Sequence, residues 1–238
     1  MKKRLDVLLV ERGLAETRAQ AQALVLAGLV RGHDKPGHQV DVDAELEVER
    51  PARFVSRGGE KLANALAQLH VELDGRNAID LGASTGGFTD CLLQNGAARV
   101  IAVDVGYGQL HPKLRDDPRV IVLERTNARE LTELPFRPDL LVCDVSFISV
   151  TLVLPPALHL LKDEWDALVL VKPQFEAGPR HAPKGVVRDP DVRAAAVAAV
   201  REHALGLGLD VLGEAPSVLT GPAGNQETFL HLRTAAAP

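Results

Sequence analysis

A glycine-rich loop headed by an acidic residue carries the clearest chemical signal in the sequence. Residues 80–89 read DLGASTGGFT and follow a short apolar run, with glycines at positions 82, 86 and 87. Glycines permit a tight turn and a close backbone approach to a ligand, and the free N–H groups of a following helix would face that ligand. The loop does not match the dinucleotide pattern G-x-G-x-x-G, and Asp80 would repel a pyrophosphate. It suits a ligand with an amino group and a sulfonium, the chemistry of S-adenosylmethionine.

Further polar residues follow the neighbouring apolar runs. Asp104 ends the next run, where a carboxylate can accept hydrogen bonds from ribose hydroxyls. Asn127 follows the third run, and it fits either a contact with adenine or a simple loop cap. Phe88, beside the loop, is explained equally well by ligand contact and by core packing. The predicted cofactor-binding residues are Asp80, Gly82, Ser84, Gly86, Gly87, Phe88, Asp104, Asn127 and Asp144.

Five short apolar runs must position these residues. Helix-length segments separate them, and they cover 78–81, 100–104, 120–123, 140–145 and 167–171. Such nearly continuous apolar strands are buried on both faces, which predicts a parallel sheet covered by helices. Four of the runs end in the polar residues Asp80, Asp104, Asp144 and Lys172. Ligands of open parallel sheets bind beyond the carboxyl ends of the strands, so we expect these four side chains at one edge.

The remaining segments complete the predicted architecture. A helix is expected over residues 190–204, and strands over 209–217 and 227–233 would form an antiparallel edge of the sheet. The predicted fold class is therefore α/β, with a doubly wound and mostly parallel sheet. Gly and Pro in the stretch 51–59 mark a joint that separates this sheet from a smaller N-terminal module.

The N-terminal module has its own pattern of two helices and short strands. Leu5, Leu8 and Leu9 share a helical face that Gly13 ends, and a capping box at residues 17–20 opens a second helix that runs to residue 28. Alternating apolar residues between 40 and 48 predict short strands. Residues 1–35 contain seven Lys and Arg against four Asp and Glu, a net charge of +3 in a chain of −5. The excess fits an anionic partner, and chance variation on a solvated surface explains it equally well.

Composition excludes several classes of protein. The 238 residues are 46% hydrophobic and 25% charged, which is typical of globular domains and not of a disordered or disulfide-rich chain. Cys91 and Cys143 lie in apolar surroundings and are interpreted as buried thiols of a reducing compartment. The eight histidines lack metal-binding spacing, so no metal is predicted. We find no signal-peptide pattern and no apolar stretch of membrane-spanning length, and we expect a cytoplasmic protein without membrane contact.

Eight ordered blocks give the sequence a specific resemblance. They are RLDVLLVERGL (4–14), SRGGEKL (56–62), DLGASTGGFTD (80–90), AVDVGYGQL (102–110), CDVSFIS (143–149), LVKPQFEAG (170–178), KGVVRD (184–189) and GPAGNQE (221–227). With them the chain resembles the TlyA, or hemolysin A-like, family of ribosomal RNA 2′-O-methyltransferases. The resemblance implies a small α+β S-four-type RNA-binding domain (1–52), a linker (53–60) and an FtsJ-like catalytic domain (61–238) with a Rossmann-like class I methyltransferase fold. It also implies S-adenosylmethionine as cofactor, and cytidine in ribosomal RNA or in assembled ribosomal subunits as substrate.

The same resemblance implies a catalytic set of two lysines and two carboxylates. The matching positions are Lys61, Asp144, Lys172 and Glu227. A ribose 2′-hydroxyl is a poor nucleophile whose proton must be removed or strongly polarised. A free lysine is almost fully protonated at pH 7, whereas burial and a second nearby lysine both disfavour the charged form. We therefore expect Lys172 to act as the base, with Lys61 and Asp144 orienting it and the hydroxyl, and Glu227 holding Lys61.

The candidates for RNA contact are Arg4, Arg12, Arg18, Arg31 and Arg57. For each of the first four taken singly, a solvated surface charge explains the residue better than a phosphate contact does. One departure from the family concerns the hairpin at residues 28–36, which is about four residues shorter than usual and weakens the case for RNA binding by the module. Three other functions compete with the main one: an RNA-binding protein of methyltransferase fold with little activity, a membrane-lytic hemolysin, and a Rossmann dehydrogenase. The complete catalytic set argues against the first, and the lack of an apolar span or basic amphipathic helix argues against the second. The missing dinucleotide pattern argues against the third.

Overall fold

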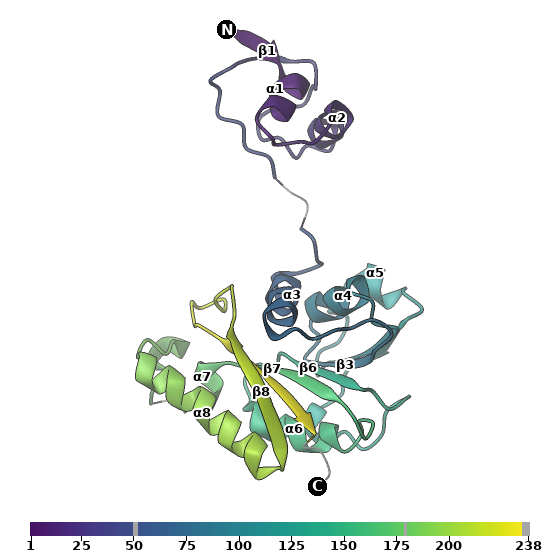
Figure 1. Cartoon of the computed structure of the whole chain (residues 1–238), viewed down its shortest axis with the longest axis vertical. Helices are drawn as coiled ribbons and strands as arrows, with labels where there is room; N and C mark the ends of the chain where they lie inside the picture. Colours follow the sequence, from purple (N-terminus) through teal and green to yellow (C-terminus); the bar gives the residue numbers. More distant parts are fainter. Residues whose placement is uncertain (50–51, 179, 235–238) are drawn as a thin grey trace. The chain divides into compact units, whose positions relative to one another are not determined.

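A seven-stranded sheet carries the polar residues that the sequence singles out. The structure is a computed structural model that describes residues 1–49, 52–178 and 180–234. The strand order is β5-β4-β3-β6-β7-β9-β8 (Figure 1). The strands are β3 (Asn77–Leu81), β4 (Arg99–Val103), β5 (Val120–Leu123), β6 (Leu140–Cys143), β7 (Asp166–Val171), β8 (Leu209–Pro216) and β9 (Thr228–Thr234). Strands β3 to β7 pair in parallel, whereas β9 runs antiparallel to both β7 and β8, so the predicted fold class is confirmed.

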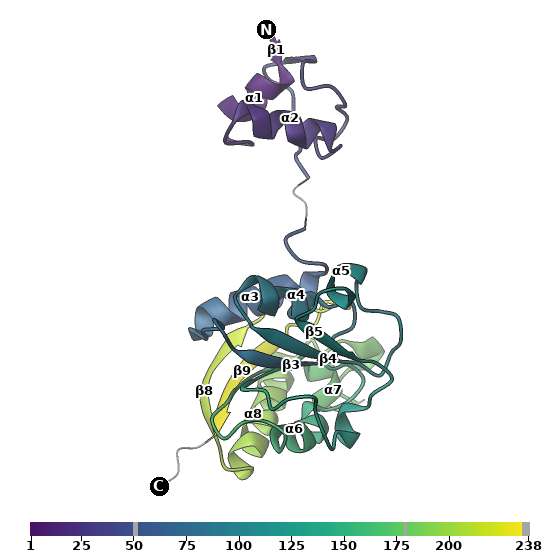
Figure 2. The same cartoon turned by 90° about the vertical axis from the view of Figure 1, so that its right-hand side faces the viewer.

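Helices cover both faces of this sheet (Figure 2). One face carries α3 (Arg57–Leu69), α4 (Gly87–Gln94) and α5 (Pro112–Arg115), and the other carries α6 (Val150–Leu158) and α8 (Pro190–Gly206). Three short helices, α7 (Pro173–Glu176), η1 (Ala128–Glu130) and η2 (Pro183–Gly185), lie in the connections. Successive strand residues point to opposite faces, so Ala78 packs in the core below α3 and α4 while Ile79 packs in the core with α6 and α8. Both faces are apolar because both are covered.

The linker that the resemblance implies at 53–60 is only partly a connection, and Pro51 of the joint predicted at 51–59 lies outside the described residues. The chain divides into the units Met1–Ala52 and Arg53–Pro238, and helix α3 already begins at Arg57, so residues 57–60 belong to a helix. Two glycines allow close packing at the start of α3. A Cβ on Gly87 would lie 2.2 Å from Ser56 Oγ, and one on Gly59 would lie 2.3 Å from the Phe54 ring. The start of α4 therefore lies close against the start of α3, and Phe54 lies close against Gly59.

The N-terminal unit contains β1 (Lys2–Arg4), α1 (Leu5–Glu11), α2 (Arg18–Leu26) and β2 (Gln39–Asp41). The predicted helix ends are confirmed, since Gly13 and Gly28 follow the helices with φ of 69° and 72°. The capping box is formed in part: Thr17 accepts from the N–H of Gln20, but the Gln20 side chain accepts from the N–H of Glu16. The strands predicted between 40 and 48 are shorter than expected, with only an isolated bridge from Val48 to Val30 after β2. Strand β1, which pairs antiparallel with β2, was not predicted from the sequence.

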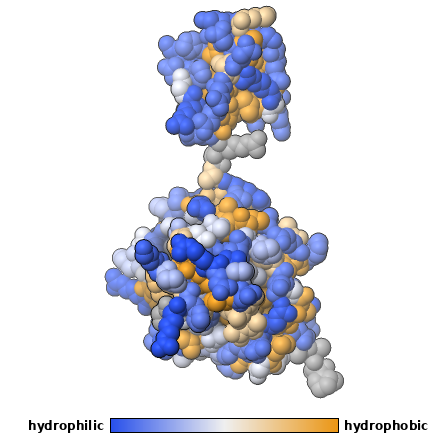
Figure 3. Space-filling view, turned by 90° about the vertical axis from the view of Figure 1, so that its left-hand side faces the viewer, coloured by the Kyte–Doolittle hydropathy of each residue, from blue (hydrophilic) through white to orange (hydrophobic). Residues whose placement is uncertain are grey.

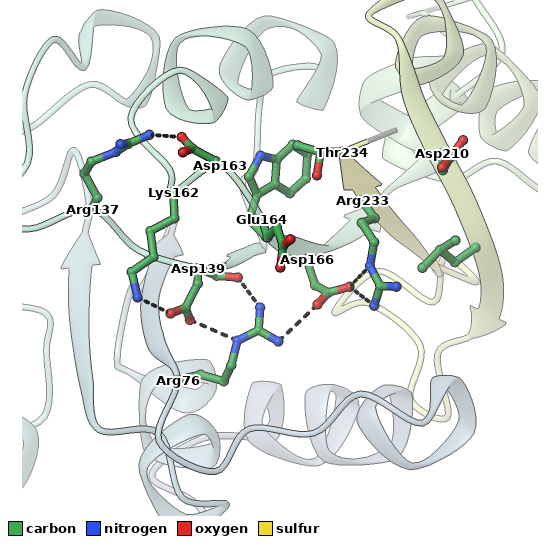
Figure 4. Close-up of a pocket in the computed structure, with 12 residues that line it drawn as sticks. Arg76, Arg137, Asp139, Lys162, Asp163, Glu164, Asp166, Asp210, Arg233 and Thr234 are labelled. Carbon is green, nitrogen blue, oxygen red and sulfur yellow. Dashed lines mark hydrogen bonds and ion pairs between the residues drawn. The ribbon is translucent and has the colours of Figure 1, made fainter. Parts of the chain in front are cut away.

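An ion-pair network closes the amino edge of the large sheet (Figure 4). Arg76 donates to Asp139 Oδ1 at 2.9 Å and to Asp166 Oδ2 at 3.0 Å, and also bonds the Asp139 carbonyl. Asp166 additionally contacts His231 at 2.8 Å and Arg233 at 2.8 Å. The network thus joins the starts of β3, β6 and β7 to β9, beside a cavity of about 1270 Å³. Because the carboxylates and cations of this network pair with one another, we interpret the network as a structural feature that stabilises this edge of the sheet.

Two further findings on the described residues concern membrane-spanning helices and groups of metal-binding side chains. In the part of the chain that the structure describes, no helix combines the length and the apolar character needed to cross a membrane. The face shown in Figure 3 is mostly hydrophilic, with hydrophobic residues interspersed. Within the described ranges, no group of three or more His, Cys, Asp or Glu side chains could hold a metal ion.

Candidate active site

The carboxyl ends of the parallel strands bring the predicted catalytic residues together. Asp144 directly follows β6 and Lys172 directly follows β7. Strand β9 runs the opposite way, with Thr228 opposite Val171, so its preceding residue Glu227 lies at the same edge. Lys61 comes from the second turn of α3. All four side chains line one cavity of about 380 Å³.

Two ion pairs organise this cavity. Lys61 Nζ lies 2.5 Å from Glu227 Oε2, and the two side chains are 10% and 1% exposed. Lys172 Nζ lies 2.6 Å from Asp144 Oδ1, with side-chain exposures of 10% and 21%. The direction of the second contact is not that of a hydrogen bond, so Asp144 Oδ1 has no hydrogen-bond donor among the described residues. Each lysine of the candidate set is therefore held by one carboxylate of the set.

The loop that precedes Glu227 is held by a buried amide. Asn225 is 1% exposed; its Oδ1 accepts from the N–H of Val187 at 2.9 Å, and its Nδ2 donates to the Gly185 carbonyl at 2.8 Å. These bonds tie the loop to the segment after α7. The position of Glu227 therefore depends on a contact between two connections that are far apart in the sequence.

A second cavity, of about 490 Å³, adjoins the first. Four residues line both cavities: Gly82, Ser84, Asp144 and Ser146. The second cavity also contains the predicted cofactor residues Asp104 and Asn127, and an apolar side formed by Val105, Ile148 and Val153. Such a site fits a ligand with a flat apolar ring at one end and a cationic group at the other, facing the carboxylate of Asp144.

The glycine-rich loop and the loop after β4 are held by one carboxylate. Asp104 Oδ2 accepts from the backbone N–H of Ser84, and Asp104 Oδ1 from that of Gly106, both at 2.7 Å. Ser84 has a φ of 50°, and a Cβ on Gly82 would lie 2.9 Å from the Asp144 carbonyl oxygen. The backbone of this loop therefore fits closely against the end of β6. Each Asp104 oxygen keeps a second lone pair that could accept from a ribose hydroxyl.

Asp80 is not placed as predicted from the sequence. It is the fourth residue of β3, faces the side of the sheet covered by α3 and α4, and is fully buried, and it lines neither cavity. Its Oδ2 accepts from the Thr89 hydroxyl at 2.7 Å, while its Oδ1 has no partner among the described residues. Burial raises the pKa of Asp80 to about 7, with smaller contributions from the negative charges of Asp144 and Asp104. Asp80 thus lies beneath the loop, where it can act on a ligand only through its charge.

Three other predicted cofactor residues have clear structural roles. Gly86 faces the α5 side, where a Cβ would meet Leu114 at 2.3 Å. Phe88 is 3% exposed and stacks on Phe229 with ring centroids 5.9 Å apart, although it also lines the smaller cavity. Asn127 caps η1 by accepting from the N–H of Arg129 at 3.1 Å. A further predicted residue, Gly87, lines the smaller cavity at the start of α4.

The arginines predicted to contact RNA are partly engaged within the protein. Arg4 and Arg18 both donate to the carboxylate of the fully buried Asp6, which also accepts from Gln22. The hydrogen bond from Arg4 is the main reason why the pKa of Asp6 lies well below its usual range. The side chains of Arg4 and Arg18 remain 43% and 55% exposed, so Asp6 holds two guanidinium groups in place without covering them.

Arg12, Arg31 and Arg57 have different surroundings. Arg12 donates to the backbone carbonyls at residues 42 and 44, and Arg31 pairs with Glu47 at 2.9 Å. Arg57 is the first residue of α3 and lines the smaller cavity beside Lys61. Within the larger unit, Arg57 therefore lies at the same cavity as Lys61 and Glu227.

Ser146 was not predicted from the sequence. Its Oγ accepts a hydrogen bond of 2.8 Å from Lys172 Nζ, and it lines both cavities. One feature of the sequence could have indicated Ser146: it lies two residues after Asp144, in the loop that follows a strand ending at the candidate site.

Comparison with known proteins identifies both units. Residues 54–234 match the family model of the FtsJ-like methyltransferases, and residues 3–31 match that of the S4 domain. The chain is 49% identical to the 16S/23S rRNA (cytidine-2′-O)-methyltransferase TlyA of Mycobacterium tuberculosis, over 97% of this chain and 90% of that protein. It is 36% identical to Hemolysin A of Brachyspira hyodysenteriae, over 96% of this chain and 98% of that protein.

A solved structure agrees with these relatives. A protein of Streptococcus thermophilus described as a candidate hemolysin superposes with a TM-score of 0.76 at 43% identity, covering 100% of this chain and 90% of its own. The predicted family is thereby confirmed, and the dehydrogenase interpretation is wrong. The chain belongs to the TlyA, or hemolysin A-like, family, with an S4 domain followed by an FtsJ-like methyltransferase domain.

Proposed function

We propose that the protein transfers a methyl group from S-adenosylmethionine to the ribose 2′-hydroxyl of a cytidine in ribosomal RNA. The observation that carries this proposal is the pair of buried lysine–carboxylate contacts in one cavity, Lys61 with Glu227 and Lys172 with Asp144. A hydroxyl acceptor needs a group that takes up its proton, and the neutral form of Lys172, held beside Asp144 in this cavity, would be such a group.

The cofactor assignment rests on the shape and polarity of the larger cavity. The apolar side chains Val105, Ile148 and Val153 would contact the adenine ring. Asp104 would accept from the ribose hydroxyls, and Asp144 Oδ1, which accepts no hydrogen bond from the described residues, would face the cationic end. The bound cofactor supplies a methyl group carried on a cationic sulfur, which makes transfer possible by positioning alone.

Each member of the catalytic set has a distinct proposed role. Lys172 accepts the proton of the 2′-hydroxyl, and Asp144 holds Lys172 and stabilises the ammonium that forms. Lys61 orients the ribose from the opposite element, and Glu227 fixes Lys61. Because Asp144 lines both cavities, it links the binding of the cofactor to the position of the base.

The substrate is proposed from the two-unit organisation and the relatives. The name of the M. tuberculosis relative specifies cytidine and both 16S and 23S rRNA. The S4 domain of this chain would contribute phosphate contacts through exposed guanidinium groups, Arg4 and Arg18 among them. Because the proposed substrate is ribosomal RNA, we propose that the protein is located in the cytoplasm.

Transfer of labelled methyl groups tests the proposal. Purified protein is incubated with labelled S-adenosylmethionine and with unmodified 30S subunits, 50S subunits or free ribosomal RNA, and the RNA is digested to nucleosides. Label in 2′-O-methylcytidine is the expected result, and the subunit that carries it defines the substrate. Label in a methylated base would contradict the proposal, and cofactor binding without transfer to any RNA would favour an inactive RNA-binding protein.

A further inference from the structure

Ser146 contacts the proposed base but lies outside the four-residue catalytic set. Lys172 Nζ donates to Ser146 Oγ at 2.8 Å, which is the best-formed hydrogen bond of this amine. Its other contacts are the ion pair of 2.6 Å with Asp144 Oδ1 and a long contact of 3.5 Å with the Asp144 carbonyl oxygen. Ser146 itself is exposed and lines both cavities, so its hydroxyl stands where cofactor and substrate would meet.

We propose that Ser146 is a positioning residue, which sets the direction of the Lys172 lone pair during methyl transfer. The proposal rests on the proposed role of Lys172 as base. A neutral lysine amine has two N–H donors and one lone pair arranged tetrahedrally. When Ser146 accepts from one N–H and Asp144 attracts the other, rotation about the Cε–Nζ bond is restricted, and the lone pair occupies the position that neither partner takes.

The proton and electron balance is consistent with this arrangement. The 2′-hydroxyl gives its proton to Lys172 Nζ, the ribose oxygen forms a bond to the methyl carbon, and the sulfur–methyl bond breaks with its electron pair on sulfur. The resulting ammonium keeps its contacts with Ser146 and Asp144 and directs its third N–H toward the methylated oxygen. Ser146 therefore contacts the same amine before and after transfer, and no group has to rearrange.

The loop that carries Ser146 is fixed on its far side by helix α7. Phe147 has a φ of 67°, in the left-handed region, and packs on Phe175 with ring centroids 5.4 Å apart. Glu176 accepts from the Ser149 hydroxyl at 2.5 Å and from the N–H of Val150 at 2.9 Å. Since α7 follows Lys172 directly, the hydroxyl and the amine are anchored to the same short helix. This support holds Ser146 in place before substrate arrives.

Two serines of this loop form a matched pair for the test. Ser149 is the N-cap of α6 and bonds Thr151 and Glu176, but it does not contact Lys172. Replacing Ser149 should lower the melting temperature, because a helix cap is lost. It should lower kcat much less than replacing Ser146 does, because the N–H of Val150 keeps its bond to Glu176. Replacing Ser146 should lower kcat and leave the melting temperature unchanged, because its hydroxyl caps no helix.

The experiment compares Ser146→Ala, Ser146→Thr and Ser149→Ala in the full chain. For Ser146→Ala we expect kcat to fall at least about tenfold, as for a misdirected catalytic group, with the RNA KM, cofactor affinity and melting temperature unchanged. Ser146→Thr keeps the hydroxyl and should recover activity to within about threefold of the wild type. In a Lys172→Ala background, Ser146→Ala should change the residual rate by less than about twofold, because the two residues act as a unit.

Each alternative result overturns the inference. A wild-type kcat in Ser146→Ala would show that the hydroxyl is not needed. A raised RNA KM at constant kcat would make Ser146 a substrate contact, and an unreduced loss in the Lys172→Ala background would show that it acts independently of the base. A Ser146→Thr protein as slow as Ser146→Ala would show that the hydroxyl is not the feature that matters. Failure of the proposed function itself would look different, since the wild type would then transfer no methyl group at all.

Discussion

Lys61 and Glu227 form a buried ion pair of 2.5 Å although 166 residues separate them in the sequence. Helix α3 supplies the lysine, and the residue before the antiparallel strand β9 supplies the carboxylate. Replacing both members of a buried pair by apolar residues is often neutral for stability, whereas removing one is costly. A role in catalysis therefore explains the Lys61–Glu227 pair better than a contribution to the free energy of folding does.

This distinction gives a prediction for the Lys61–Glu227 pair. Glu227→Gln leaves the Lys61 charge buried without a counter-charge, so stability should fall by about 3 kcal/mol and methyl transfer by about 10²-fold. The double variant Lys61→Met/Glu227→Leu should regain the melting temperature of the wild type and remain inactive. Thermal unfolding and single-turnover transfer measure the two effects. An active double variant would remove the pair from the mechanism.

The pKa of Asp80 predicts a pH dependence of cofactor binding. Burial raises this pKa to about 7, so the carboxyl is mainly neutral below pH 7. The contribution of the Asp80 carboxyl to the free energy of unfolding is at its maximum below about pH 4, the pKa of an unfolded Asp. This contribution is lost as pH rises through about 7. A cationic ligand above the loop favours the ionised form. Cofactor affinity should therefore increase as pH rises through about 7, with release of a proton on binding.

Calorimetry in buffers of different ionisation enthalpy measures that proton. Asp80→Asn should bind the cofactor with an affinity that no longer changes between about pH 6 and about pH 8, since the titrating group has been removed. Its matched control is Asp74→Asn, which changes a carboxylate that lines neither cavity. A wild-type protein whose affinity is flat across this range would contradict the proposed role of Asp80.

Only some residues of the site could be predicted from the sequence pattern. Whether a residue could be predicted depends on the element that carries it. Asp104, Asp144 and Lys172 follow apolar strands, and parallel strands end at one edge, so their proximity could be derived. Lys61 and Glu227 could not be derived in this way, because one lies on a helix and the other precedes an antiparallel strand. Only the family resemblance placed them, and the structure brings them into contact.

Two features of the site depend on contacts that the hydrophobic pattern does not show. Asp80 lies in the predicted run 78–81, but its side chain points to the face covered by α3 and α4 and lines neither cavity. Ser146 was overlooked because a serine in a loop carries no periodic signal, and its contact with Lys172 joins two connections 26 residues apart. The fold class can be predicted from the pattern of hydrophobic residues. Predicting a contact between two single side chains also requires the register of the strands, which the sequence does not show.

The ion-pair network at the amino edge of the sheet should contribute to the free energy of unfolding in a way that depends on acid pH. Despite the cost of burial, hydrogen bonds from His231, Arg76 and Arg233 hold the pKa of Asp166 well below its usual range. The contribution is present above the unfolded pKa near 4 and is lost as pH falls through the lower folded value. Asp166→Asn should therefore cost about 3 kcal/mol at pH 7, and the difference from wild type should shrink toward about pH 2.

Denaturant titrations at several pH values check the contribution of Asp166. The matched control is Asp163→Asn in the same cavity, whose side chain is 94% exposed in its pair with Arg137. This change should cost less than about 0.5 kcal/mol. An Asp166→Asn penalty that stays constant over the whole acid range would show that the carboxylate charge is not what stabilises the edge.

The N-terminal unit predicts the salt dependence of RNA association. A chain that lacks residues 1–52 has neither the guanidinium groups held by Asp6 nor the separate core of this unit. Its RNA affinity should fall, and the slope of log affinity against log salt should flatten by about one for each phosphate that the shortened chain no longer binds. Unchanged affinity and slope would show that this S4 domain does not bind the RNA backbone.

The most direct test of the mechanism replaces the proposed base. Single-turnover methyl transfer to ribosomal subunits is measured for the wild type and for Lys172→Ala, together with cofactor affinity by calorimetry. We expect Lys172→Ala to slow transfer by about 10²- to 10⁴-fold while the cofactor still binds, because the lysine acts on the hydroxyl proton. Full transfer by Lys172→Ala would contradict the role of Lys172 and of the hydrogen bond that holds it.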